Sequence, residues 1–153
     1  MKKSTFIAAG IAAAAILLIV VMVAGINNRA ISLEEQISGA EAQINVAEKR
    51  RVDLIHNLVD TVTAYQEYEG ETMLAITEAR AAAQAGDADE AMTVLNAVSE
   101  QYPELKANEN YQQLMTELAL TENSIAQYRN NYNEQVKAYN KCVRQFPNSF
   151  VLG

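Results

Sequence analysis

The sequence has few of the residues that interrupt helices or build reactive centres. Its 153 residues include two prolines, six glycines, one cysteine, one histidine and no tryptophan. Alanine, leucine, glutamate, glutamine and asparagine dominate instead, so strong helix formers meet few chain breakers. The composition therefore favours an all-α fold and gives little support to a β-sheet.

Cysteine and histidine are too scarce for the common metal-binding and nucleophilic sites. Cys142 has no second cysteine for an intramolecular disulfide, and no Cys/His cluster exists to hold a metal. No glutamate stands three residues before His56, as a dinuclear site in a helical bundle would need. Lys141 and Arg144 lie near Cys142, but there is no second histidine to act as its base, so we interpret Cys142 as a semi-exposed helical thiol. The sequence predicts no enzymatic activity, no cofactor and no bound metal.

The negative net charge argues against nucleic-acid partners. The chain carries 19 acidic and 12 basic residues, which gives a formal net charge of −7. Proteins bind a phosphate backbone through a concentrated basic face, and the run Lys49–Arg51 is too short to form one. We therefore expect no binding to DNA or RNA.

A long apolar run follows the first five residues. Residues 6–26 are 21 consecutive positions without a charged side chain, and at about 1.5 Å per residue such a helix crosses a hydrocarbon core of roughly 30 Å. A cleaved secretory signal is the alternative, because Val23–Gly25 resembles a small-residue cleavage site. The apolar core of a signal usually has about 7–15 residues, so the longer run favours a transmembrane anchor.

Charges on either side of this run predict its orientation. Lys2 and Lys3 precede it within residues 1–5, whereas Arg29 and then three glutamates follow it. Positively charged segments tend to stay in the cytoplasm. We therefore expect residues 1–5 to be cytoplasmic and residues 27–153 to lie outside the cytoplasm.

Residues 27–153 show the periodicity of amphipathic helices. No Gly-, Pro- or Ser-rich linker follows the apolar run, so the first helix is expected to continue outward until it ends or bends near Glu69–Glu71. Two short helices are expected over 71–85 and 87–101. A long last helix follows, with Asn108 as its possible N-cap and Phe146–Pro147 at its end.

Two long helices that frame two short ones predict an antiparallel four-helix bundle, continuous with or close behind the membrane helix. In the first short helix Met73, Ile76 and Ala83 are expected to face inward. A tetratricopeptide repeat is the competing interpretation of residues 86–103. A weakly similar segment follows 44 residues later, whereas the tetratricopeptide repeat has a period of 34 residues. We therefore reject the repeat interpretation.

Charged and amide residues stand beside an apolar stripe in residues 48–65. Six polar residues on the two long helices form the candidate site, namely Arg50, Arg51, Asp53, Asn57, Asn133 and Asn140. We interpret them as a polar network that fixes the register of the helices, because an unpaired buried polar group costs about 1–3 kcal/mol. Asp53 or Asn57 is then expected near Asn133 or Asn140. The alternative is a ligand or peptide site around Arg50, Arg51 and Asn57.

Several separated motifs, in this order, resemble the LemA family of bacterial membrane proteins. They are the N-terminal span, Ala47–Val59, Tyr102–Asn108, the pairs Tyr132–Asn133 and Tyr139–Asn140, and Phe146–Pro147. Two features depart from the family. Proline is common in the family where this chain has His56, and members usually continue past the Phe-Pro motif into a longer tail, so a truncated or lost tail is expected here.

The resemblance implies a single-span protein of the bacterial inner membrane with an extracytoplasmic four-helix bundle and no established catalytic activity. It also suggests partners in membrane-protease or envelope-maintenance systems. We therefore expect a membrane-anchored scaffold or adaptor that acts through protein–protein contacts or self-association. The small residues Ala9, Gly10, Ala13 and Ala14 provide spacings that would let two spans approach closely.

Overall fold

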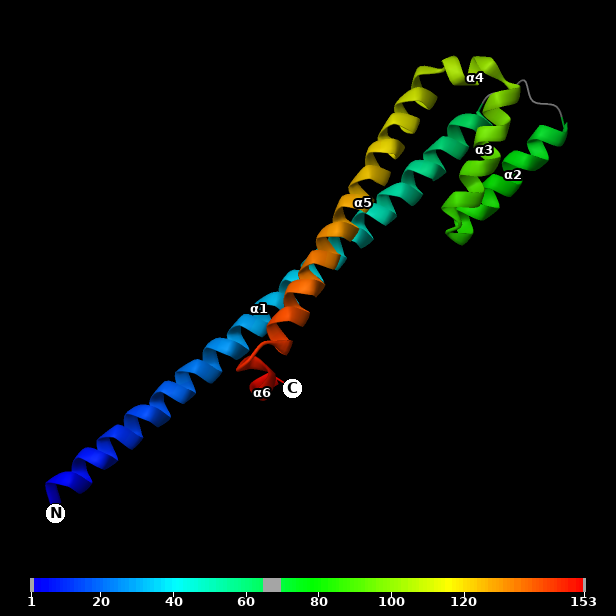
Figure 1. Cartoon of the computed structure of the whole chain (residues 1–153). Coiled ribbons are helices and arrows are strands. Elements are labelled where there is room, and N and C mark those ends of the chain that lie inside the picture. The colour runs from blue at the N-terminus through cyan, green and yellow to red at the C-terminus, as the bar shows by residue number, and fades with distance from the viewer. Residues whose placement is uncertain (1, 65–69, 153) are drawn as a thin grey trace. The chain divides into compact units, whose positions relative to one another are not determined.

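A computed structural model describes residues 2–64 and 70–152 and shows an all-α chain (Figure 1). No strand occurs in these two ranges. The described helices are α1 (Lys2–Thr63), α2 (Gly70–Ala85), α3 (Ala88–Gln101), α4 (Pro103–Ala107), α5 (Glu109–Arg144) and α6 (Asn148–Leu152). The predicted fold class is confirmed, and so is the uninterrupted passage of the first helix from the apolar run into the amphipathic segment.

The chain divides into two compact units. The terminal unit comprises Met1–Glu41 and Asn130–Gly153, and the central unit comprises Ala42–Arg129. Each unit therefore takes part of α1 and part of α5. The arrangement of residues 27–153 as one four-helix bundle stays a prediction.

The core of the central unit is built on the apolar stripe of α1. Leu54, Ile55, Leu58, Val59 and Val62 are all buried, and Val62 is completely inaccessible to solvent. Their spacing of three and four places them on one face of the helix, as predicted. Burial of each of these side chains stabilises the fold by about 1.5–3 kcal/mol. Tyr65, the last expected member of the stripe, lies outside the described residues.

The helices α2 and α3 cover this stripe with small side chains. Ala79, Ala82 and Ala83 of α2 and Ala88 and Ala91 of α3 belong to the same core cluster as the stripe. Alanine is a strong helix former, and its short side chain lets two helices approach closely. Larger side chains complete the core from α2 to α5, namely Ile76, Leu95, Val98, Leu105, Tyr111 and Leu118.

Two predicted helix starts are confirmed by side-chain caps. Gly86 adopts a φ of 83°, which only glycine reaches without strain, and ends the turn after α2. The next residue, Asp87, accepts a hydrogen bond of 3.0 Å from the backbone N–H of Glu90 and caps α3. Asn108 caps α5 in the same way, through a 3.1 Å bond from the backbone N–H of Tyr111.

Two burial predictions are wrong. Met73 is exposed, and Thr72 is buried in its place, because the inward face of α2 runs through Thr72, Ile76, Ala79 and Ala83. The predicted semi-exposed thiol is also buried, since only 4% of Cys142 is accessible. The reason lies in the segment after Pro147, which forms the unpredicted helix α6 and returns to α5.

The return of α6 is held by Asn148. Its side-chain Nδ2 donates a 2.9 Å hydrogen bond to the backbone oxygen of Cys142 and lies 3.4 Å from the sulfur. The bond satisfies one of the carbonyl groups that the end of α5 leaves without a helical partner. Cys142 is thereby enclosed within the terminal unit.

The first part of α1 has the character of a membrane-spanning helix. Its most apolar window has a mean hydropathy of 3.0 and is not buried by any other part of the described chain. Among the described residues it is the one helix long and apolar enough to cross a bilayer. Packing within the terminal unit begins at Ile26 and Ala30, which are buried although Asn27 to Arg29 are exposed.

Leucines on α2 and α3 provide a matched test of the central core. Leu95 is completely buried, whereas Leu74 is 67% exposed. We expect Leu95→Ala to lower the free energy of unfolding by about 2–5 kcal/mol, because it leaves a cavity in the core. Leu74→Ala should change it by less than about 0.5 kcal/mol. Urea unfolding of the full chain in detergent, followed by circular dichroism, measures both; equal losses would refute the assigned core.

Candidate functional site

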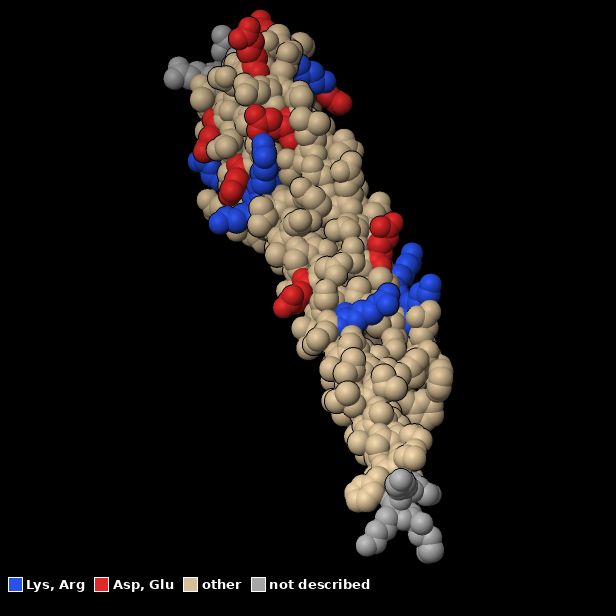
Figure 2. All heavy atoms as spheres, turned by 90° about the vertical axis from the view of Figure 1, so that its left-hand side faces the viewer, with Lys and Arg blue, Asp and Glu red and all other residues tan. Residues whose placement is uncertain are grey.

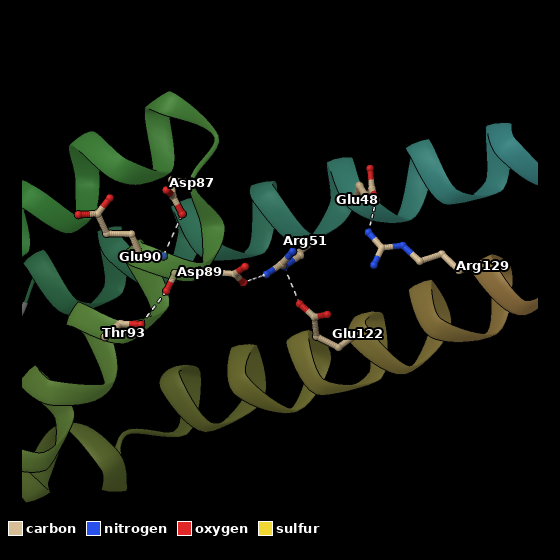
Figure 3. Close-up of polar contacts among 8 residues, drawn as sticks. All are labelled: Glu48, Arg51, Asp87, Asp89, Glu90, Thr93, Glu122 and Arg129. Carbon is tan, nitrogen blue, oxygen red and sulfur yellow. Dashed lines mark hydrogen bonds and ion pairs between the residues drawn. The ribbon is translucent and has the colours of Figure 1, made fainter.

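Arg51 is the polar residue that joins most elements of the central unit. It projects from α1 between α3 and α5, where its guanidinium meets the carboxylates of Asp89 and Glu122 (Figure 3). Nε of Arg51 lies 2.5 Å from Oε1 of Glu122, an ion-pair contact without the direction of a hydrogen bond. Only 21% of the Arg51 side chain is exposed. Three helices are thus connected through one cation.

The local sequence explains this position. Arg51 precedes Leu54 and Ile55 by about one turn, so its aliphatic stem borders the core while its charged end reaches the rim. Asp89 lies in the first turn of α3, where a negative charge is favoured by the helix dipole. The hydroxyl of Thr93 donates a 2.8 Å hydrogen bond to the backbone oxygen of Asp89. Asp89 therefore belongs to a helix start that is capped independently of Arg51.

Two of the other ion pairs of the central unit, both between α1 and α5, lie nearer the solvent than the Arg51 contacts. Nη2 of Arg129 is 2.8 Å from Oε1 of Glu48, and Nη2 of Arg50 is 3.5 Å from Oε2 of Glu117. Both pairs connect α1 with α5, and both arginine side chains are at least 60% exposed. Exposed pairs of this kind contribute about 0–1 kcal/mol. These two pairs therefore add little to the free energy of unfolding, and their main effect is on the register of α1 and α5.

A groove of about 490 Å³ lies between α1 and α5 in the central unit. Val46 and Ala47 line it from α1, and Leu120 and Tyr128 line it from α5. Val46 is 70% exposed and Leu120 is 61% exposed, so the groove presents two large apolar side chains to solvent. The Arg50–Glu117 pair forms part of its wall. We call these residues the α1–α5 groove.

The six candidate residues differ from one another in their contacts and in their exposure to solvent. Arg50 and Arg51 are adjacent in sequence but have separate partners, and the Asp53 and Asn57 side chains are exposed. Asn133 and Asn140 are exposed in the terminal unit. Their expected contact with Asp53 or Asn57 would join the two units and stays a prediction.

The acidic partners of Arg51 were not identified from the sequence. Asp89 and Glu122 belong to helices far from Arg51 in the chain, and both stand among other exposed polar residues. A first-turn acid such as Asp89 is a recognisable helix-start feature, but nothing in its spacing points to Arg51. No group of three or more His, Cys, Asp or Glu side chains positioned to hold a metal occurs in the described part of the chain.

Tyr139 provides a second polar link, inside the terminal unit. Its phenol donates a 2.8 Å hydrogen bond to Oε1 of Glu34 and so connects α5 with α1. This hydrogen bond raises the pKa of Tyr139 above its usual value of about 10, with smaller contributions from burial and from the charge of Glu34. The neighbouring Asn140 does not take part. The predicted Tyr–Asn pairs therefore include one tyrosine with a defined structural contact.

Comparison with known proteins gives a family match over most of the chain. The model of the LemA family matches residues 40–153. Protein LemA of Metamycoplasma hominis is 31% identical over 134 residues, which cover 80% of this chain and 61% of that relative. The chain thus spans less than two thirds of the length of this curated relative.

Arg51 and Arg50 form a natural pair of test variants. We expect Arg51→Ala to lower the free energy of unfolding by about 1–2 kcal/mol, because two carboxylates lose their shared cation and a half-buried stem is removed. Arg50→Ala should cost less than about 0.5 kcal/mol, since its pair is exposed. A double-mutant cycle of Arg51→Ala with Glu122→Gln, measured by urea unfolding, should show coupling. Strict additivity would refute the link between α1 and α5.

The Tyr139–Glu34 contact predicts a pH dependence. Because the folded state raises the pKa of Tyr139, the stabilisation is complete below about pH 10 and is lost as the pH rises through the raised pKa. Unfolding by urea at about pH 8 and about pH 11 should show a smaller decline for Tyr139→Phe than for the unchanged chain. Tyr128→Phe serves as the control and should keep the original decline. Identical declines in all three proteins would contradict the assignment.

Proposed function

The chain belongs to the LemA family, and from this membership and the apolar start of α1 we propose that it is a membrane-anchored scaffold or adaptor of the bacterial cell envelope. It acts through protein–protein contacts and has no catalytic role. Its N-terminus is cytoplasmic, and the helical region after the span lies outside the inner membrane. The charges of Lys2 and Lys3 support this orientation.

The α1–α5 groove is the observation that carries the proposal. It is lined by the exposed side chains of Val46 and Leu120 together with the partly apolar ring of Tyr128. A largely apolar groove between two helices suits a third amphipathic helix, which inserts side chains spaced by three or four residues. The Arg50–Glu117 pair offers one charge of each sign at the edge. A helical segment of a partner protein is therefore the proposed occupant.

The family resemblance suggests where such a partner comes from. Membrane-protease and envelope-maintenance systems contain proteins that must be held near the bilayer, and a single-span adaptor meets that need. Self-association through the same groove is the variant of this proposal in which the partner is a second copy. The chain's negative net charge of −7 makes a basic partner helix the more favourable electrostatic match.

A peptide-binding module around Arg50, Arg51 and Asn57 is the second candidate. The wall position of Arg50 in the groove favours it. Arg51, however, faces two carboxylates that already balance its charge, so its electrostatic attraction for a small anion is weak. An extended or helical peptide that contacts Arg50 fits the site better than an isolated anionic ligand.

Crosslinking in native membranes tests the adaptor proposal. We expect a photoreactive residue at Leu120 to capture a partner protein or a second copy, while the same residue at the similarly exposed Leu74 does not. Leu120→Arg should reduce recovery of that partner at least tenfold in a pull-down, and Leu74→Arg should leave it unchanged. Both sites are exposed, so neither charge should disturb folding.

The two candidates give different outcomes in this experiment. Recovery of the free monomer alone from every variant would refute the adaptor. Loss of the partner on Asn57→Ala, with Leu120→Arg unaffected, would favour the binding module, because Asn57 does not line the groove.

A further inference from the structure

The segment after α5 exposes two aromatic rings and no charge. Phe146 is 80% exposed and Phe150 is 84% exposed, the highest values among the large apolar residues of the described chain. Their ring centroids are 6.0 Å apart and the rings meet edge to face. No charged side chain occurs in residues 145–152. Such a surface is poorly suited to water and well suited to an apolar or interfacial surrounding.

This segment lies near the end of the membrane span within the terminal unit. The helices α1 and α5 run in opposite directions (Figure 1), and Tyr139 is fixed opposite Glu34. Along α5 and the turn that follows, Phe146 is seven residues beyond Tyr139, and along α1 Ile26 is eight residues before Glu34. At about 1.5 Å per residue these positions differ in height by only a few ångströms. Phe146 therefore lies at the level where the uncharged run of α1 ends.

Basic side chains stand next to this apolar segment. Lys141 and Arg144 occupy the last turn of α5, and Arg29 follows the span on α1. All three are exposed, and none has an ion-pair partner in the part of the chain that the structure describes. Figure 2 shows Lys and Arg side chains gathered where the long uncharged surface ends. Aromatic rings with adjacent cations are the usual composition of a membrane–water interface.

We propose that residues 145–152 form an interfacial anchor, in which Phe146 and Phe150 insert into the surface of the bilayer that α1 spans. Lys141 and Arg144 then bind the phosphates of anionic lipid headgroups. This inference rests on the proposed membrane anchoring. It adds a second attachment, more than 100 residues after the first in the sequence, and fixes the end of α5 at the bilayer.

The adjacent charges favour lipid over a second copy of the chain as the occupant. A symmetric contact through Phe146 and Phe150 would bring the Lys141 and Arg144 side chains of two copies close together, and like charges would repel. An anionic lipid surface offers the opposite sign and is continuous with the environment of residues 6–26. One apolar surface would thus cover both the span and the aromatic pair.

Tryptophan fluorescence gives a direct test because the natural chain has no tryptophan. The full-length protein with Phe150→Trp is reconstituted in vesicles of phosphatidylglycerol and phosphatidylcholine. We expect its emission to shift to shorter wavelength, to be quenched by lipids brominated near the headgroup, and to resist quenching by aqueous acrylamide. Ile19→Trp is the positive control within the span, and Leu74→Trp is the exposed control on α2.

Three outcomes of this experiment would contradict the interfacial anchor. Emission of Phe150→Trp that matches Leu74→Trp, while Ile19→Trp is quenched by lipid, would overturn the anchor and leave the membrane span intact. A shifted emission that brominated lipid does not quench would mean that protein covers the aromatic pair, and would also overturn it. Lack of lipid quenching for Ile19→Trp would overturn the anchor together with the proposed membrane anchoring.

Removal of the cations tests the headgroup contact separately. In the Phe150→Trp background, Lys141→Gln with Arg144→Gln should reduce the preference for quenching by brominated phosphatidylglycerol over brominated phosphatidylcholine by about fivefold for each charge removed. Glu134→Gln, on the same helix, is the matched control and should not reduce it. An unchanged preference in the double variant would refute binding of anionic headgroups by these two side chains.

Discussion

Burial of the apolar stripe on α1 is the interaction on which the central unit depends. Leu54 to Val62 present five large side chains to one side of the helix, and none of them can be covered by α1 itself. Helices α2, α3 and α5 are arranged to exclude water from this face. The alanines of α2 and α3 matter here because they let those helices approach closely. The turn at Gly86 and the caps at Asp87 and Asn108 then fix where each covering helix begins.

Arg51 is best understood in relation to that stripe. Its stem borders the core and its guanidinium meets Asp89 and Glu122 at the rim, so the residue links the helices that cover α1. The exposed carboxylates retain much of their hydration, which keeps the desolvation cost of these pairs low and their net contribution modest. The same geometry explains why a concentration of Arg, Asp and Asn on one helix does not require a catalytic centre. On this polar flank Arg51 finds its partners on neighbouring helices, whereas the Asp53 and Asn57 side chains face solvent.

The sequence predicts the helices better than their contacts, and the reason is physical. Along α1 the large apolar residues recur at intervals of three and four, and polar residues occupy the positions between them. This pattern identifies the buried face. In α2 the many alanines fit a buried or an exposed face equally well, so the sequence predicts an inward Met73 although Thr72 is the buried residue. Asp87 and Asn108 could be assigned because a cap is local. The partners of Arg51 could not, because Asp89 and Glu122 reach it only after α3 and α5 have packed. Burial of Cys142 depends in the same way on α6, whose five residues are too few to give a periodic signal.

The distribution of exposed apolar surface connects the structure with the proposed roles. A water-soluble surface tolerates single exposed leucines, but contiguous apolar patches indicate a missing partner or a membrane. Three apolar surfaces within residues 6–64 and 70–152 bear on the proposed roles, and their surroundings differ. The run 6–26 has no charge at all, which is typical of a bilayer interior. Phe146 and Phe150 adjoin Lys141 and Arg144, which have no ion-pair partner among the described residues, and this composition is typical of a headgroup region. The α1–α5 groove has a paired arginine and glutamate at its wall, and an ion pair that is already neutral attracts neither lipid phosphates nor a cation. Its apolar floor is therefore the part of the molecule best suited to a protein helix, because protein partners supply apolar side chains without requiring a net charge opposite to that of the wall.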